Sequence, residues 1–407
     1  MSVAQPTRYA LRNVRLLDGR GGRQERMTIL IEGAQIRSVG PARSTAIPRG
    51  SVELDVSRAT VLPGLIDCHV HLCLGAEPDV VDALARETPT ETLLKASHMA
   101  RQTVEAGITT VRDVGARDHA IFALKQAIER GLTPGPRIIG AGLAICMIGG
   151  HARFIGQEVE GVEQVRAAVR DQISAGADVI KVIASGGVLT PGTSPDEAQM
   201  TMDELRAAVD EARLAGRKVA AHAHGASGMK NAVRAGVHSI EHATLMDDES
   251  AALMVEQGVY MVPTLSALAT TAGCPRGCGI PDQARDKAKA MTRRHQTSFR
   301  QAHRRGLRIA MGTDAGTPFN HHGENTQELE RMVALGLSAM EALVTATSKA
   351  ADLLGWDHRI GSIEPGKDAD LLIVDGDPSR RIGLLQRRER ILGVMQDGRL
   401  VAGPLSR

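Results

Sequence analysis

Aromatic residues, net charge and long apolar runs are all scarce in this sequence of 407 residues. Phe, Trp and Tyr make up 2% of the chain, too few for the stacking surfaces on which proteins bind single-stranded nucleic acid. The net charge of +2 favours neither nucleic acid nor an anionic membrane as a partner. No apolar run could cross a bilayer, and the opening residues MSVAQPTRYALRN lack the apolar segment of a secretion signal. These absences predict a soluble, cytoplasmic protein that binds neither nucleic acid nor membrane.

Cysteine is scarce as well, and its pattern argues against an extracellular scaffold. The five cysteines are widely spaced and odd in number, which is not typical of a secreted disulfide framework. Cys274 and Cys278 lie close together in a loop rich in Gly and Pro, where they could form a disulfide or bind a metal. A lone pair in such a loop is more often two free thiols, which is the interpretation taken from the sequence.

What the sequence does contain is a pair of histidines at the end of an apolar run. Residues 61–72 read VLPGLIDCHVHL, with His69 and His71 one residue apart. On an extended strand, side chains two positions apart point to the same side. Two imidazoles aimed at one point suit a metal such as zinc. One buried and one exposed histidine would give the same pattern, so the interpretation depends on ligands from other strands.

Strand-like and helix-like patterns alternate through the middle of the chain. Several helical patterns end in Ala-Gly, at 106–107 and 235–236, where a glycine ends the helix before a buried strand. Eight such alternations predict an α/β fold, a (β/α)8 TIM barrel over residues 61–360, with a doubly wound open sheet as the competing arrangement. The predicted strands are 61–72, 108–114, 137–141, 179–184, 219–224, 239–243, 260–265 and 309–313.

The two ends of the chain contain short strand patterns without intervening helices. Residues 1–60 are broken by turns such as Asp18-Gly19 and Glu32-Gly33, and strand-like segments recur at 369–374 and 391–396. A few strands rarely form a stable sheet alone. We therefore expect residues 1–60 plus 361–407 to form one small β-sandwich domain.

Metal-ligand residues recur where the predicted strands end. Reactive groups of such barrels gather at the C-terminal ends of the strands, so these side chains are expected to meet at one mouth. Lys181 is unusual, because a cation in an apolar strand is costly. It could pair with a carboxylate, act as a Schiff-base lysine, or, as a neutral amine, add CO2 to form a carbamate that bridges two metals. The candidate ligands are His69, His71, Lys181, His222, His242 and Asp314.

These motifs resemble those of the amidohydrolase superfamily. The resemblance covers essentially the whole chain, and within the superfamily it is nearest to the imidazolonepropionase-related branch with Xaa-Pro dipeptidases, arginine/lysine carboxypeptidases and ochratoxin-hydrolysing enzymes. It implies two divalent metal ions, usually zinc, with manganese or cobalt not separable by ligand type. The implied ligands are His69, His71 and Asp314 for the more buried metal, His222 and His242 for the more exposed one, and carboxylated Lys181 with a hydroxide as bridges.

The resemblance implies a metal-dependent hydrolase that cleaves the amide bond of a dipeptide or N-acyl amino acid, ochratoxin-like amides included. Asp314 is expected to take the proton of the attacking water and pass it to the leaving nitrogen. His151 and His224 are expected to stabilise the oxyanion or to bind a substrate carboxylate. Arg153 could bind a carboxylate or be a solvated surface residue, and Gly186 allows a close approach of the backbone to a ligand.

Other functions stay open at this point. The metal centre would also suit a cyclic-amide hydrolase like imidazolonepropionase, or a carbamate or ester hydrolase. A mononuclear deaminase is disfavoured, because no Glu follows the strand that ends in His222 and His224. A non-catalytic binding protein would be expected to have lost ligands, and none is missing. The expected partner is a small amide or peptide, and a homo-oligomer is expected because relatives often form one.

Overall fold

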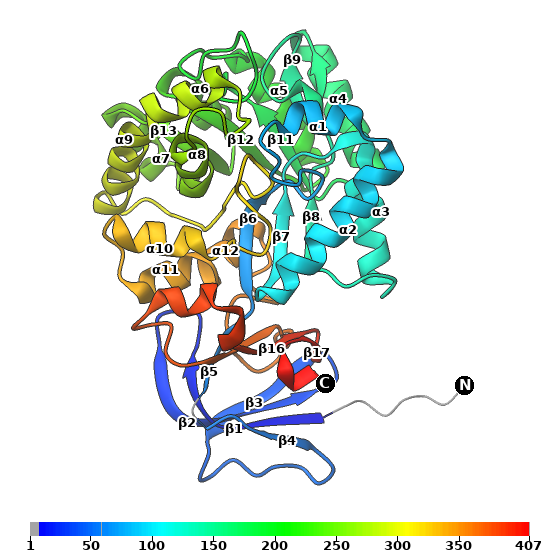
Figure 1. Cartoon of the computed structure of the whole chain (residues 1–407), viewed down its shortest axis with the longest axis vertical. Helices are drawn as coiled ribbons and strands as arrows, with labels where there is room; N and C mark the ends of the chain where they lie inside the picture. The colour runs from blue at the N-terminus through cyan, green and yellow to red at the C-terminus, as the bar shows by residue number, and fades with distance from the viewer. Residues whose placement is uncertain (1–7, 58, 407) are drawn as a thin grey trace.

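The computed structural model describes residues 8–57 and 59–406. A β-sheet built from both ends of the chain lies beneath a larger α/β body (Figure 1). The terminal sheet contains β1 (Arg8–Leu17), β2 (Arg23–Glu32), β3 (Gln35–Pro41), β4 (Val52–Asp55), β5 (Ala59–Pro63), β15 (Leu371–Asp375), β16 (Ile391–Gln396) and β17 (Arg399–Ala402). Its strand order is β17-β16-β15-β5-β1-β2-β3, with β4 paired to β1. The two ends of the chain thus share one sheet, as predicted.

The α/β body has parallel strands throughout. They are β6 (Leu65–Val70), β7 (Ile108–Asp113), β8 (Arg137–Gly140), β9 (Ala144–Met147), β10 (Gly156–Val159), β11 (Val179–Ile183), β12 (Lys218–Gly225), β13 (Ser239–Leu245) and β14 (Tyr260–Val262). Three of them pair in the order β6-β7-β8, and six in the order β10-β9-β11-β12-β13-β14.

Backbone contacts join these two sheets at both edges. The N–H of Asp178, just before β11, donates to the carbonyl of Gly140 at the end of β8 (2.8 Å). On the other side, residues 309–315 form parallel bridges to β14 at Met261 and to β6 at Val70. The sequence predicted a regular strand at 309–313, whereas the structure has single bridges there. The arrangement is an α/β fold of the TIM-barrel type.

The predicted strand over 61–72 is divided by Gly64. Before it, β5 runs antiparallel to β15 in the terminal sheet, with Leu62 opposite Leu372. After it, β6 pairs with β7 in the α/β body. A Cβ atom at Gly64 would lie 2.2 Å from the hydroxyl of Thr109, so only glycine fits where the chain passes from one sheet to the other.

Helices surround the parallel strands (Figure 1). They are α1 (Val80–Arg86), α2 (Pro89–Glu105), α3 (Ala120–Glu129), α4 (Gly161–Ala175), α5 (Met202–Leu214), α6 (Ala226–Ala235), α7 (Asp248–Glu256), α8 (Leu265–Gly273), α9 (Asp282–Arg304), α10 (Gln327–Ala334), α11 (Ala339–Thr345) and α12 (Ser348–Leu354). Short 3-10 helices lie at Arg117–His119, Arg153–Ile155, Ile382–Gln386, Arg388–Arg390 and Pro404–Ser406.

Local sequence explains where many of these helices begin and end. The hydroxyl of Thr88 caps α2 while Glu91 reaches back to the cap, and the pair Thr201 and Glu204 does the same for α5. Gly176 ends α4 in the left-handed conformation, which glycine adopts without strain. Among the described residues, none of the helices has both the length and the apolar character needed to span a bilayer.

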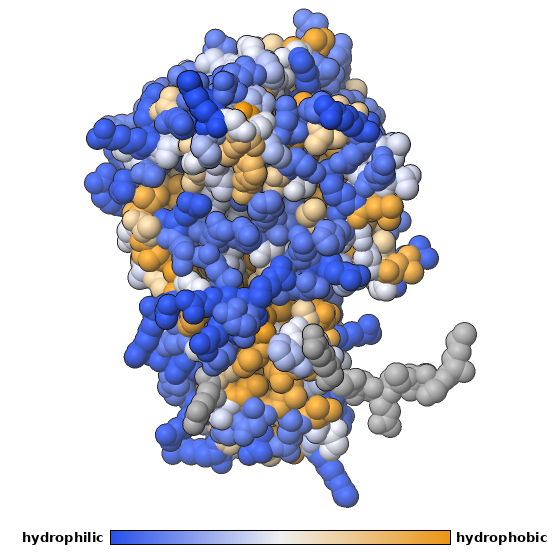
Figure 2. Space-filling model, viewed as in Figure 1, coloured by the Kyte–Doolittle hydropathy of each residue, from blue (hydrophilic) through white to orange (hydrophobic). Residues whose placement is uncertain are grey.

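The hydrophobic core lies between the strands and the helices, with a second apolar cluster in the terminal sheet. On the face in Figure 2, hydrophobic residues gather over the terminal sheet, while hydrophilic residues dominate the body above it. The core positions the parallel strands so that their C-terminal ends point into one cleft.

Candidate metal centre

A cleft opens where the parallel strands end. All the candidate ligands line it and all are buried, Lys181 at 3% exposure and Asp314 at 8%. They come from β6, from the turn after it, from β11, β12 and β13, and from the segment that follows residue 309. The structure therefore brings together His69, His71, Lys181, His222, His242 and Asp314, with His151 and His224 beside them.

Asp314 lies against His69, near the end of β6, and against His71, just after that strand. Its Oδ1 is 3.4 Å from Nε2 of His69 and 3.2 Å from Nε2 of His71. Their other ring nitrogens are held from behind, that of His69 by Glu241 (2.8 Å) and that of His71 by the carbonyl of Gly115 (2.8 Å). Both Nε2 atoms are thereby aimed at the carboxylate, an arrangement typical of oriented metal-ligand histidines.

A second group of imidazoles lies across the cleft. Ligand nitrogens of His222, His224 and His242 lie within 4.8 Å of one another. Thr264 holds Nδ1 of His242 at 2.6 Å, and Thr244 holds Nδ1 of His224 at 2.8 Å.

His222 is oriented differently from its neighbours. Its Nε2 donates to the carbonyl of Gly186 at 3.3 Å, so its Nδ1 is the ring nitrogen left for a ligand. His242 is also a member of a set with His69 and Asp314 whose ligand atoms are equally close, so the two groups adjoin.

Backbone strain accompanies the two ends of the site. Asp314 has φ of 60° and His242 has φ of 71°, a left-handed conformation that non-glycine residues rarely adopt. Such strain concentrates at functional sites, where the surrounding structure has to hold it. Around Asp314, Asp67 supplies that support by accepting hydrogen bonds from the N–H and hydroxyl of the adjacent Thr313.

Lys181 lines the same cleft as the two groups, and within residues 8–57 and 59–406 it forms no salt bridge. The carboxylates whose charges act on it are those of Glu241 and Asp314, and these are already paired with Arg112 and the histidines of β6. Burial lowers the pKa of the Lys181 ammonium to about 8. Lys181 is therefore a buried amine that lines the cleft together with imidazoles and a carboxylate.

Electrostatics keeps His222, His224, His242 and Asp314 in protonation states that bind metals. At His71, burial lowers the pKa, but the hydrogen bond and charge of Asp314 outweigh it and raise that pKa. Burial lowers the pKa of His222, His224 and His242, so their rings are neutral. Burial would raise the pKa of Asp314, but the charges and hydrogen bonds of His69 and His71 outweigh it and lower that pKa, so the group is ionised. Neutral imidazoles with one free nitrogen each, together with a carboxylate, fit a divalent metal.

A buried charged network behind His69 was missed from the sequence. Glu241 accepts a hydrogen bond from Arg112 (2.8 Å) and from the hydroxyl of Ser239 (2.6 Å), and Arg112 also donates to the carbonyl of Cys68 (2.6 Å). Arg112 is 2% exposed and Glu241 is fully buried. The signal was available, since each is a charged residue within an otherwise apolar strand.

The remaining predicted site residues have different positions. His151 lines the cleft, with its ring centroid 4.6 Å from that of His222 and its Nδ1 held by Thr190 (2.9 Å). Gly186 contributes the carbonyl that orients His222 but does not line the cleft. Arg153 is exposed and is not part of the cleft wall. Gly187 was not singled out, although a Cβ there would lie 2.2 Å from Nε2 of His151.

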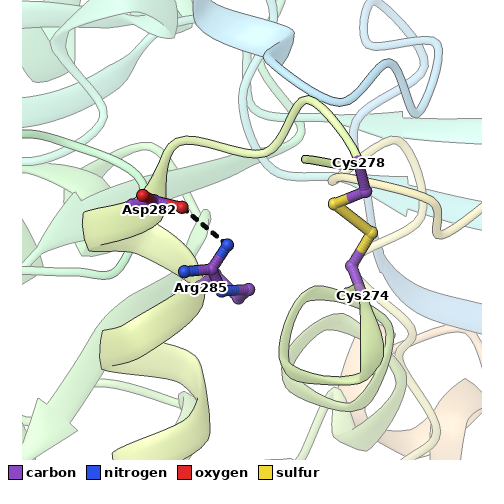
Figure 3. The surroundings of a disulfide bond; sticks show 4 residues. All are labelled: Cys274, Cys278, Asp282 and Arg285. Atoms are coloured by element: carbon purple, nitrogen blue, oxygen red, sulfur yellow. Dashed lines mark ion pairs between the residues drawn. A yellow bond between two sulfur atoms is a disulfide. The ribbon is translucent and has the colours of Figure 1, made fainter. Parts of the chain in front are cut away.

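The interpretation of Cys274 and Cys278 as free thiols is wrong. The two residues form a disulfide, which closes the loop between α8 and α9 (Figure 3). The segment around residues 268–282, in which no element was predicted, contains α8 and this bridge. The turn over the three residues between them brings the side chains together, a geometry that spacing alone did not decide.

The sequence is similar to those of known hydrolases. The sequence profile of the Amidohydrolase family matches residues 60–401. An ochratoxinase of Aspergillus niger is 30% identical over 374 residues, covering 84% of this chain and 76% of that protein. An imidazolonepropionase of Sphingopyxis alaskensis is 26% identical over 407 residues, covering 89% of this chain and 91% of that protein.

Solved structures agree as well. The crystal structure of a Xaa-Pro dipeptidase with methionine bound in its active site has a TM-score of 0.91 and 37% identity, covering 98% of this chain and all of that one. The chain belongs to the amidohydrolase family. It is a hydrolase of carbon–nitrogen bonds in amides, in a family that generally uses divalent metals, and its His and Asp cluster is suited to bind one.

Proposed function

We propose that this protein is a binuclear metal-dependent hydrolase that cleaves the amide bond of a dipeptide or an N-acyl amino acid, ochratoxin-like amides included. One observation carries the proposal: six buried ligand-type side chains, Lys181 among them, line one cleft. The similarity to a Xaa-Pro dipeptidase and to an ochratoxinase supports the substrate class.

Two divalent ions, zinc as the first choice, would be held by the two adjoining groups. His69, His71 and Asp314 would hold the more buried ion, and His222 and His242 the more exposed one. Lys181, as a carbamate, would supply the anionic bridge that two cations require. Bound there, the metals would lower the pKa of a water and polarise the scissile carbonyl.

The protein's own residues would then handle the protons and the developing charge. Asp314, ionised and facing the centre, takes the proton of the attacking water and delivers it to the leaving nitrogen. His151 and His224 face the cleft from either side of His222, where a ring N–H donates to the oxyanion. Arg153 lies outside the cleft wall, so the imidazoles are the groups we assign to this role.

We also infer the finer architecture from the backbone contacts that join the two parallel sheets. Residues 61–360 form a closed (β/α)8 barrel, and the described parts of residues 1–60 and 361–407 form a small β-domain built on one sheet. The inserted barrel carries the chemistry, and the terminal domain supports its base. The expectation of a homo-oligomer in the cytoplasm stays a prediction.

The test is a hydrolysis screen of the metal-loaded protein, with metal content measured on the same sample. We expect about two metal ions per chain and hydrolysis of dipeptides or N-acyl amino acids above that of cyclic amides, carbamates and esters. Removal of metal by a chelator should abolish the activity, and added zinc should restore it. A preference for cyclic amides, as the similarity to an imidazolonepropionase would suggest, contradicts the proposal.

A further inference from the structure

We infer that the cleft selects substrates by an uncharged, apolar group that lies against the apolar residues of its lining, which we call the apolar wall, and this inference rests on the proposed function. Away from the metal centre, the lining is almost entirely aliphatic or aromatic. The apolar side chains belong to Leu74, Val114, Phe154, Ile155, Val188 and Leu268, with Leu189 beside them. Such an apolar lining suits an aromatic or branched aliphatic group.

The wall offers no partner for a negatively charged substrate side chain. Among the described residues, Lys181 is the only lysine in the lining, and no arginine contributes to it. The ammonium of Lys287, which does not line the cleft, donates to the carbonyls of Gly187 (3.3 Å) and Thr193 (2.6 Å). Arg153 is exposed outside the wall. A carboxylate placed along the wall would lose its water without gaining an ion pair.

The wall equally lacks a partner for a basic side chain. Asp314 is the only carboxylate in the described lining, and it already faces His69 and His71. Of the buried carboxylates outside the lining, Glu241 is paired with Arg112 and His69, and Glu328 accepts hydrogen bonds from the N–H groups of Leu265 and Ser266. Arginine and lysine side chains are therefore excluded for the same reason as glutamate and aspartate.

The apolar wall is held in place by tertiary contacts. Leu268 comes from α8, and Val188 and Leu189 come from the loop after β11. Leu268 and Val188 belong to one apolar cluster with Ile280, against which Cys274 and Cys278 pack. The disulfide closes the start of the loop that follows α8, and Asp282 pairs with Arg285 within the first turn of α9, where the loop ends (Figure 3). A wall fixed in this way can discriminate between side chains of different chemistry.

The experiment compares matched substrates on the metal-loaded protein. Dipeptides carry Phe, Leu, Arg or Glu at one position and Gly at the other, in both orders. We expect kcat/KM for Phe and Leu to exceed that for Arg and Glu by about tenfold or more in at least one order. Calorimetric binding of N-acetyl-Phe, N-acetyl-Arg and N-acetyl-Glu, which share one carboxylate and differ only in the side chain, should rank in the same way.

Variants of the wall test which residues make the selection. Leu268→Arg should lower kcat/KM for the Phe and Leu substrates by about tenfold or more. Leu189→Arg, at a partly buried loop position, is a second variant with a smaller risk of misfolding. The matched control is Leu214→Arg, since Leu214 is 82% exposed at the end of α5 and should leave all rates unchanged.

The outcomes distinguish a failure of the apolar selection from a failure of the proposed amide hydrolase function. Equal or better hydrolysis and binding of the Arg or Glu compounds overturns the apolar selection while leaving the amide hydrolase in place. An unchanged preference in both wall variants overturns the assignment of the wall. Preferential binding of N-acetyl-Phe without hydrolysis of any amide supports the apolar selection and contradicts the proposed function.

Discussion

The hydroxyl of Thr264 lies 2.6 Å from Nδ1 of His242 and does not cap the helix that Thr264 precedes. Thr264 is the N-cap residue of α8, with φ of 51°, and its side chain makes no capping hydrogen bond. Glu328 of α10 caps the helix instead, because its carboxyl group accepts from the N–H of Leu265 (2.7 Å) and of Ser266 (2.8 Å). One carboxylate from a distant helix thus frees a threonine to orient a candidate ligand.

Thr264→Val should weaken metal binding without unfolding the protein. Valine has nearly the same shape but cannot hold Nδ1 of His242, and loss of such a supporting group typically costs about 10- to 100-fold in metal affinity. Metal affinity should be measured by competition with a chelator. Thr297→Val, at an exposed hydroxyl on α9, is the control and should bind metal as the unmodified protein does. Equal affinities in both variants would exclude the orienting role of Thr264.

Glu328 should make stability depend on pH near neutrality. Burial raises the pKa of its carboxyl group from 4.5 to about 7, against the hydrogen bonds from Ser266 and Leu265. Since the folded state holds this proton more tightly than the unfolded state, the group's contribution to stability is fully present below about pH 4.5 and is lost as the pH rises through about 7.

The measurement compares the unmodified protein with Glu328→Gln. Glutamine cannot ionise, so the unfolding midpoint of the variant minus that of the unmodified protein should increase between pH 5 and pH 8. Other titrating groups are common to both proteins and cancel in the difference. A difference that is constant across this range would contradict the raised pKa of Glu328.

Lys181→Ala should lose metal and activity together. If the side chain bridges two metals as a carbamate, its removal leaves the centre without an anionic bridge, and a short carboxylic acid should restore part of both. Metal content by elemental analysis and hydrolysis rates are the two readouts. Lys230→Ala, at a lysine that pairs with Asp247 and Glu249 far from the cleft lining, should change neither. Full activity of Lys181→Ala would rule out a bridging carbamate.

Glu241→Gln should destabilise the fold as well as the site. It leaves the guanidinium of Arg112 buried without its counter-charge, which typically costs about 3–5 kcal/mol. Urea unfolding of the metal-free protein measures this loss. Glu32→Gln breaks an exposed pair with Arg8 and should cost at most about 1 kcal/mol. Similar losses in the two variants would mean that the buried network does not support the strands beneath His69.

The sequence by itself determined the α/β class, the sharing of one sheet by the two chain ends, and the residues that gather at the cleft. Each of these follows from local pattern: strand periodicity places His69 and His71 on one side, and parallel strands bring their C-terminal ends to one mouth. The supporting partners lie too far apart for any local pattern to show. Glu241 is 172 residues from His69 and 129 from Arg112, and Glu328 is 63 from Leu265.

Only the tertiary structure decided which groups orient the candidate ligands and what the cleft is made of. It placed Arg153 outside the wall and joined Cys274 to Cys278. It also divided the predicted strand 61–72 at Gly64, because the residues before Gly64 pair with the terminal sheet and those after it pair with β7. These outcomes depend on packing. The partner of a side chain is set by the distant elements that pack against it, and the local hydrophobic periodicity of the sequence does not encode those contacts.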